Sequence, residues 1–296
     1  MTKKDKIAYG KLYSKFNARI ERYALAFFIK VLKEQSASIR GLLNEYPLEY
    51  LLANLNTLIQ ESVFQNEFDK FYQEIGEKFL KFHSIDLSIK KDKDPLQGVT
   101  NAINISFRNA EKIAELAKIS QSAEVGQKVS KITEHTQKLI RETIEQGIAD
   151  NKTKPQIAKE IQSKTGGAIA KKRALVIART ETTFISSKAA EINIQDSPFK
   201  MLKTWIPVND ILRTRPDHLA MFSHETIPKD EMFNVGGVSM KYPGDFAGGA
   251  ANCVNCRCGI VYTPVKPDNP LIDSSTGSLL SNLVIGQILS ELFSDN

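Results

Sequence analysis

Residues 241–262 read KYPGDFAGGAANCVNCRCGIVY, and this segment says most about how the C-terminal part of the chain folds. It contains Cys253, Cys256 and Cys258, which are all the cysteines of the 296-residue chain. Three sulfurs so close in sequence are typical of a metal site or of a tightly linked corner. Because the number of cysteines is odd and no secretory leader pattern precedes them, we expect a reducing compartment and no disulfide scaffold.

A histidine upstream of this segment completes a set of four candidate zinc ligands: His218, Cys253, Cys256 and Cys258. Zinc in structural sites takes four soft or borderline donors in a tetrahedron, and Cys-x-x-Cys spacing is a common half of such a site. The Cys-x-Cys half is less usual, and His224 is an alternative fourth ligand. The competing interpretation is that the cysteines are reduced and packed at the base of a turn. No cofactor is certain at this stage, and zinc is the candidate.

An enzymatic interpretation of the same residues is a metal-dependent hydrolase or nuclease centred on His218 and Cys253, Cys256 and Cys258. Such an enzyme needs a ligand set with an open position and a general base beside it. The sequence offers no such arrangement, so we predict that the chain is not an enzyme.

Positive charge is concentrated at the N-terminus. Residues 1–33 hold nine Lys or Arg side chains against two acids, Asp5 and Glu21. Such a segment attracts polyanions or an acidic protein face. The candidate nucleic-acid contacts are Lys3, Lys4, Lys6, Lys11, Lys15, Arg19 and Arg22. The alternative is a solvated helix rich in lysine.

Hydrophobic periodicity predicts an α+β chain that is mostly helical, without a membrane-spanning segment. Residues 1–150 are predicted to form a bundle of long helices that begins with the basic helix. Residues 151–264 are predicted to form a small α+β domain, because Thr153 and Gln156 have capping-box spacing and strand-like segments follow residue 200. Residues 265–296 are predicted to be a linker and an apolar, amphipathic C-terminal helix that docks onto a partner or onto its own domain.

Six short motifs in order resemble the head morphogenesis domain of phage Mu F-like minor head proteins. Their order and separation over residues 150–264 are similar to those of that family, although each motif alone is weak. The motifs are Ala178-Arg-Thr-Glu181, Lys203-Thr-Trp-Ile, Arg213-Thr-Arg-Pro-Asp-His218, Phe233-Asn-Val-Gly-Gly, Tyr242-Pro-Gly-Asp245 and Asn255-Cys-Arg-Cys258.

The resemblance implies a minor capsid protein of a tailed double-stranded DNA phage or prophage. Such a protein is made in the host cytoplasm, lies inside the head beside the portal, and acts in head assembly and genome packaging or ejection. The implied partners are the portal protein, scaffolding and capsid proteins, and double-stranded DNA. The family-motif positions map here to Arg179, Glu181, Trp205, Arg215, His218, Asp245, Asn255, Cys256, Arg257 and Cys258. Related sequences more often carry an aliphatic residue at the position of Cys253, so the resemblance does not imply a three-cysteine zinc site.

Overall fold

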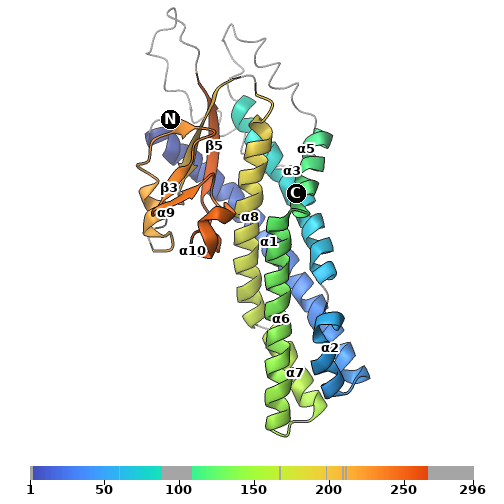
Figure 1. The fold of residues 1–296 in the computed structure, drawn as a ribbon. Helices are drawn as coiled ribbons and strands as arrows, with labels where there is room; N and C mark the ends of the chain where they lie inside the picture. The colour runs from blue at the N-terminus through green and yellow to red at the C-terminus, as the bar shows by residue number, and fades with distance from the viewer. Residues whose placement is uncertain are drawn as a thin grey trace, which may run out of the picture. The chain divides into compact units, whose positions relative to one another are not determined.

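The computed structural model describes residues 3–59, 61–88, 109–166, 168–197, 199–208, 210 and 212–265. Long helices make up most of this part of the chain (Figure 1). Their order is α1 (Lys3–Glu45), α2 (Leu48–Leu58), α3 (Glu61–Ser88), α5 (Asn109–Ser120), α6 (Ala123–Ala149), α7 (Lys154–Gly166) and α8 (Ala168–Ile194). None of the described helices is long and apolar enough to cross a membrane. The prediction of a mostly helical α+β chain is confirmed.

Short antiparallel sheets follow the helices. Strand β1 (Met201–Ile206) lies between β2 (Ile227–Pro228) and β5 (Gly259–Pro264), and its Trp205 is paired with Ile260. Strands β3 (Phe233–Val235) and β4 (Val238–Met240) form a hairpin. The short helical elements between these strands are α9 (Pro216–Ala220), η1 (Phe246–Gly248) and α10 (Gly249–Cys253).

The hairpin turn has a direct cause in the sequence. Gly236 and Gly237 have φ values of 58° and 85°. A two-residue turn whose twist matches the flanking strands needs positive φ at both central positions, which glycine adopts without steric cost. This hairpin is one of the strand-like segments predicted after residue 200.

The chain divides into two compact units, and neither is continuous in sequence. One unit, here called the sheet unit, comprises residues 1–18, 76–114 and 183–296. The other, here called the helical unit, comprises residues 19–75 and 115–182. The division of the sequence into 1–150, 151–264 and 265–296 stays a prediction about domains. The apolar helix expected near the C-terminus lies outside the described residues.

The helical unit has an aliphatic core where α6 and α7 meet α1 and α2. Its members are buried Ile and Leu side chains: Ile39, Leu43, Leu51, Leu55, Ile59, Ile140, Ile144, Ile157 and Ile161. The turn between α6 and α7 carries the predicted cap, since the Gln156 side-chain oxygen accepts from the Thr153 amide at 2.8 Å. The capping interaction starts α7 where the sequence predicts a helix.

The sheet unit has an aromatic core at the start of α1. Phe16 is stacked on Phe82 with ring centroids 4.5 Å apart and meets Phe79 edge-on at 5.4 Å. Tyr13 is buried, and its hydroxyl lies 3.2 Å from Ser186 Oγ and 3.3 Å from the Cys258 carbonyl oxygen. Tyr13 therefore connects the first helix to the cysteine segment.

Two glycines of α6 test how tightly α6 and α7 pack. A Cβ atom at Gly147 would lie 2.5 Å from Ile157 Cγ1, whereas a Cβ atom at Gly126 meets nothing within 4 Å. We expect Gly147→Ala to lower the free energy of unfolding by about 1–3 kcal/mol through overpacking, even though alanine favours helix. Gly126→Ala is the matched control and should raise it by about 0.5–1 kcal/mol. Urea unfolding followed by far-UV circular dichroism measures both, and equal effects would contradict the packing described here.

Candidate functional site

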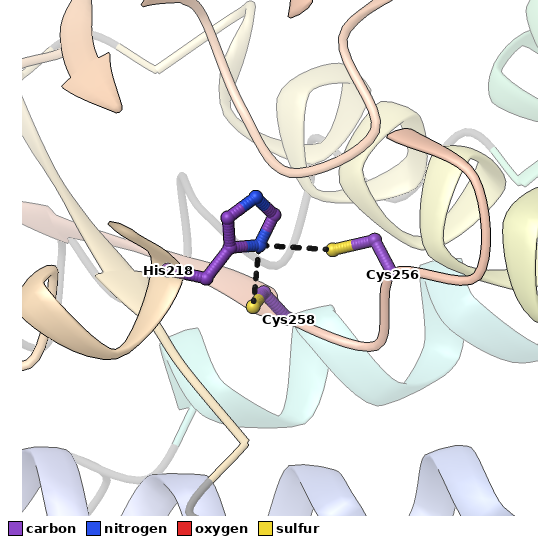
Figure 2. Close-up of side chains that lie close together, drawn as sticks. All are labelled: His218, Cys256 and Cys258. Atoms are coloured by element: carbon purple, nitrogen blue, oxygen red, sulfur yellow. Dashed lines mark hydrogen bonds between the residues drawn. The ribbon is translucent and has the colours of Figure 1, made fainter. Parts of the chain in front are cut away.

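The cysteine segment and His218 come from different elements of the sheet unit and meet beneath β1. Helix α10 ends at Cys253, and the chain then turns at Asn255, whose φ of 60° lies in the left-handed region. Asparagine tolerates this region better than most residues. Cys256 and Cys258 follow the turn and lead into β5, while His218 lies on α9. The turn therefore brings both cysteines back toward α9 (Figure 2).

Three donor atoms converge at this place. His218 Nδ1 lies 3.6 Å from Cys256 Sγ and 3.5 Å from Cys258 Sγ, and one ligand atom from each residue lies within 4.8 Å of the others. Figure 2 shows both sulfurs facing the same ring nitrogen. The relative exposure is 1% for His218 and 2% for each cysteine. We call these three residues the His–Cys–Cys cluster.

The orientation of the His218 ring is set by Asn252. Asn252 Nδ2 donates to the Gly248 carbonyl oxygen at 3.2 Å, which turns Asn252 Oδ1 toward His218 Nε2 at 3.3 Å. An amide oxygen only accepts hydrogen bonds, so Nε2 carries the ring proton and Nδ1 presents its lone pair to the two sulfurs. Trp205 meets the ring edge-on with centroids 5.5 Å apart and closes the other side.

The two cluster cysteines do not hold their protons equally. A hydrogen bond between the two thiols lowers the pKa of Cys258 and raises the pKa of Cys256. Burial opposes the lowering at Cys258. Cys258 is therefore the sulfur that becomes a thiolate more readily, and thiolate is the form that binds metals.

Cys253 does not belong to the cluster, which corrects the predicted ligand set. Its Sγ donates to the Asp245 carbonyl oxygen at 2.7 Å. Because α10 ends at Cys253 and the backbone reverses at Asn255, Cys253 is not among the three residues whose ligand atoms converge. His224, the alternative ligand, instead has its Nδ1 2.9 Å from the Glu225 carbonyl oxygen and packs on Phe233.

We compared the chain with known protein families, curated proteins and solved structures, and one family matches. The family model described as Phage Mu protein F like protein matches residues 137–261. Residues 137–261 are therefore similar to the Phage Mu F-like family. No curated protein and no solved structure matches the chain. The matched region begins within α6 and ends within β5, so it includes the whole His–Cys–Cys cluster.

The matched family is one of phage head morphogenesis proteins. The family is one of structural head proteins and not of enzymes. The alternative of a metal-dependent hydrolase or nuclease therefore gains no support from the comparison.

Several residues of the motifs predicted from the sequence fix loops around the cluster. Asp245 accepts from the Lys241 amide at 2.6 Å and from the Ala247 amide at 3.1 Å, which caps η1. Arg215 donates to the Val254 carbonyl oxygen at 2.6 Å. A further ion pair joins Arg257 to Asp210 at 3.6 Å. These side chains hold the turns that position the cluster.

Two Phage Mu F-like motif residues, Arg179 and Glu181, belong to the helical unit and not to the sheet unit. Glu181 is buried and accepts from the Tyr72 hydroxyl at 2.6 Å and from Lys128 Nζ at 2.9 Å. Arg179 pairs with Glu21 at 3.2 Å. A buried carboxylate needs partners of this kind, so the motif Ala178-Arg-Thr-Glu181 serves helix packing.

Other residues that support the cluster were missing from the sequence interpretation. Thr183 Oγ1 donates to the Cys256 carbonyl oxygen at 2.5 Å, and Ser187 Oγ donates to the Pro243 carbonyl oxygen at 2.8 Å. Both hydroxyls lie on one face of α8, one turn apart, and both are buried. Their hydroxyls satisfy carbonyl groups that the irregular loops cannot pair within themselves.

The predicted nucleic-acid contacts lie on α1, with one correction. Lys6 is buried, and its Nζ donates to the His224 carbonyl oxygen at 2.5 Å, so it is committed to an internal contact. Lys11, Lys15 and Arg22 are exposed, and Arg19 is half-buried. Lys3 and Lys4 have helical backbone, but their side chains lie outside the described part.

Asp245 provides a test of the loop-holding role. Asp245→Ala removes two acceptors from backbone amides, and we expect a loss of about 1–2 kcal/mol in the free energy of unfolding. Asp245→Asn keeps one oxygen acceptor and should lose less. The control is Asp230→Ala, because Asp230 has an 82% exposed side chain; its change should stay within about 0.5 kcal/mol. Urea unfolding followed by Trp205 fluorescence measures all three. An Asp245→Ala variant as stable as the control would overturn this role.

Proposed function

We propose that this chain is a minor head protein of a tailed double-stranded DNA phage or prophage. In this proposal it lies inside the head beside the portal and acts in head assembly and in genome packaging or ejection. The observation that carries the proposal is the family match over residues 137–261. Portal, scaffolding and capsid proteins are the proposed protein partners, and the capsid interior near the portal is the proposed location.

The motif side chains make internal contacts, and this supports a function that works through protein contacts. Glu181, Asp245 and Arg215 are engaged with neighbouring backbone or side chains, as described above. The His–Cys–Cys cluster is also buried. Residues placed in this way stabilise a fold and present its outer surface. The surfaces that meet partners are therefore to be found outside the motifs.

Helix α1 offers such a surface. Successive residues of an α-helix are about 100° apart, so one arc of about 80° contains six basic residues whose side chains the structure describes. We call them the basic stripe: Lys11, Lys15, Arg19, Arg22, Lys33 and Arg40. Five of them are exposed and Arg19 is half-buried. The acidic residues of α1 (Asp5, Glu21, Glu34 and Glu45) all fall outside this arc.

The chemistry of the basic stripe fits a polyanion. From Lys11 to Arg40 the helix rises roughly 44 Å at 1.5 Å per residue. Double-stranded DNA carries about one negative charge per 1.7 Å of its axis, so phosphates are available along the whole stripe. We propose that the basic stripe contacts packaged DNA. An acidic face of the portal protein is the alternative partner.

Particle composition tests the proposed location. We expect the chain in purified mature particles, detected by mass spectrometry, and we expect it to co-purify with portal protein from procapsids. Tail proteins recovered from the same preparation serve as the control for particle integrity. A chain found only in the unassembled fraction of infected or induced cells would refute the proposal.

Charge removal tests the DNA contact. We expect the triple variant Lys11→Gln, Lys15→Gln and Arg22→Gln to bind double-stranded DNA more weakly. Its slope of log affinity against log salt should fall by about 0.9 for each phosphate that the variant no longer neutralises. The matched control removes three exposed charges elsewhere, Lys70→Gln, Lys81→Gln and Lys138→Gln, whose side chains are 66%, 58% and 74% exposed. If both variants change affinity equally, the basic stripe is not the DNA contact, and portal binding becomes its proposed role.

A further inference from the structure

We propose that the His–Cys–Cys cluster is a zinc site with three protein ligands: His218 Nδ1, Cys256 Sγ and Cys258 Sγ. Cys253 is excluded from the set, and one solvent molecule completes the tetrahedron. This site is distinct from the proposed role in the phage head, and its test does not depend on that role.

The distances match zinc coordination. Zinc–sulfur bonds of about 2.3 Å and zinc–nitrogen bonds of about 2.0–2.1 Å at tetrahedral angles place sulfur and nitrogen roughly 3.6 Å apart. The two distances from His218 Nδ1 are 3.6 Å to Cys256 Sγ and 3.5 Å to Cys258 Sγ. Both sulfur–nitrogen separations are therefore those of ligands around one ion, and all three donor atoms lie within 4.8 Å of one another.

Hydrogen bonding alone accounts less well for this convergence. A neutral imidazole has one acceptor nitrogen, and that nitrogen has a single in-plane lone pair. Only one of the two thiols can donate to this lone pair, so without an ion the other thiol must use the neighbouring sulfur as its partner. An ion between the three atoms satisfies all of them at once, and Figure 2 shows both sulfurs directed at the same nitrogen.

The surroundings supply the second shell that a zinc-binding histidine normally has. The ring nitrogen that does not bind metal usually donates to a carbonyl, carboxylate or water, which fixes the tautomer and the ring orientation. Here Asn252 Oδ1 accepts from His218 Nε2, and Asn252 is itself held by the Gly248 carbonyl oxygen. This chain of contacts leaves Nδ1 without a proton and aimed at the sulfurs.

Charge balance also suits a buried ion. Two thiolates and one neutral imidazole around Zn²⁺ give a site of zero net charge. Burial of a neutral site avoids the large cost of an unpaired charge. The bound ion would join α9 to the segment before β5, which stabilises a region that has only short strands.

Metal content and ligand identity test the proposal on the full chain. Protein purified with zinc and then dialysed should hold about one zinc per chain by mass spectrometry of the metal. X-ray absorption of this wild-type protein should show two sulfur ligands and two nitrogen or oxygen ligands. Three sulfur ligands would bring Cys253 into the site and overturn the three-ligand assignment. No retained zinc, or fewer than two sulfur ligands, would overturn the site itself.

Variants give an independent result. Cys256→Ser and Cys258→Ser should reduce retained zinc to background, whereas Cys253→Ser keeps a donor for the Asp245 carbonyl oxygen and should retain about one zinc per chain. Cobalt added to the metal-free wild type should give the charge-transfer bands of cobalt–thiolate bonds. Those bands should persist in Cys253→Ser, and their loss there would contradict the assignment even if the other variants fail to fold.

Discussion

The sheet unit depends on one constraint: two cysteine sulfurs must approach the same nitrogen of a buried histidine. Meeting it requires the left-handed turn at Asn255, the orientation of the His218 ring by Asn252, and Trp205 packed against that ring. The surrounding loops are held by hydrogen bonds from α8 and from Tyr13. The short strands contribute few residues, so side-chain contacts of this kind supply much of the order in this unit.

The side chains of the predicted Phage Mu F-like motifs therefore mainly make internal contacts. They specify a capped loop at Asp245, a buried carboxylate at Glu181 and the cluster around His218. None of these groups forms an outer surface. The basic stripe of α1 is a positively charged surface, and it precedes the matched region. This separation fits a structural protein whose family-specific residues maintain the fold while other residues meet partners.

Sequence patterns predicted the parts of the fold that depend on local chemistry. Helical periodicity indicated the long helices of residues 1–150, the spacing of Thr153 and Gln156 indicated the start of α7, and strand-like segments were expected after residue 200. Sequence patterns could not predict contacts between residues that are far apart in the chain. Cys-x-x-Cys spacing predicted Cys253 as a zinc ligand. The spacing alone does not reveal that a helix ends at Cys253. Lys6 looked like a surface charge because its partner, the His224 carbonyl oxygen, is 218 positions away. Asn252 and Thr183 carry no motif signal of their own.

The protonation of the His218 ring tests the central claim most directly, because the whole arrangement requires Nδ1 to face the sulfurs as an unprotonated donor. Ring-nitrogen chemical shifts and long-range hydrogen–nitrogen correlations of the full chain report which nitrogen carries the proton. The account predicts a proton on Nε2, shared with Asn252 Oδ1, and none on Nδ1. A proton on Nδ1 would contradict it.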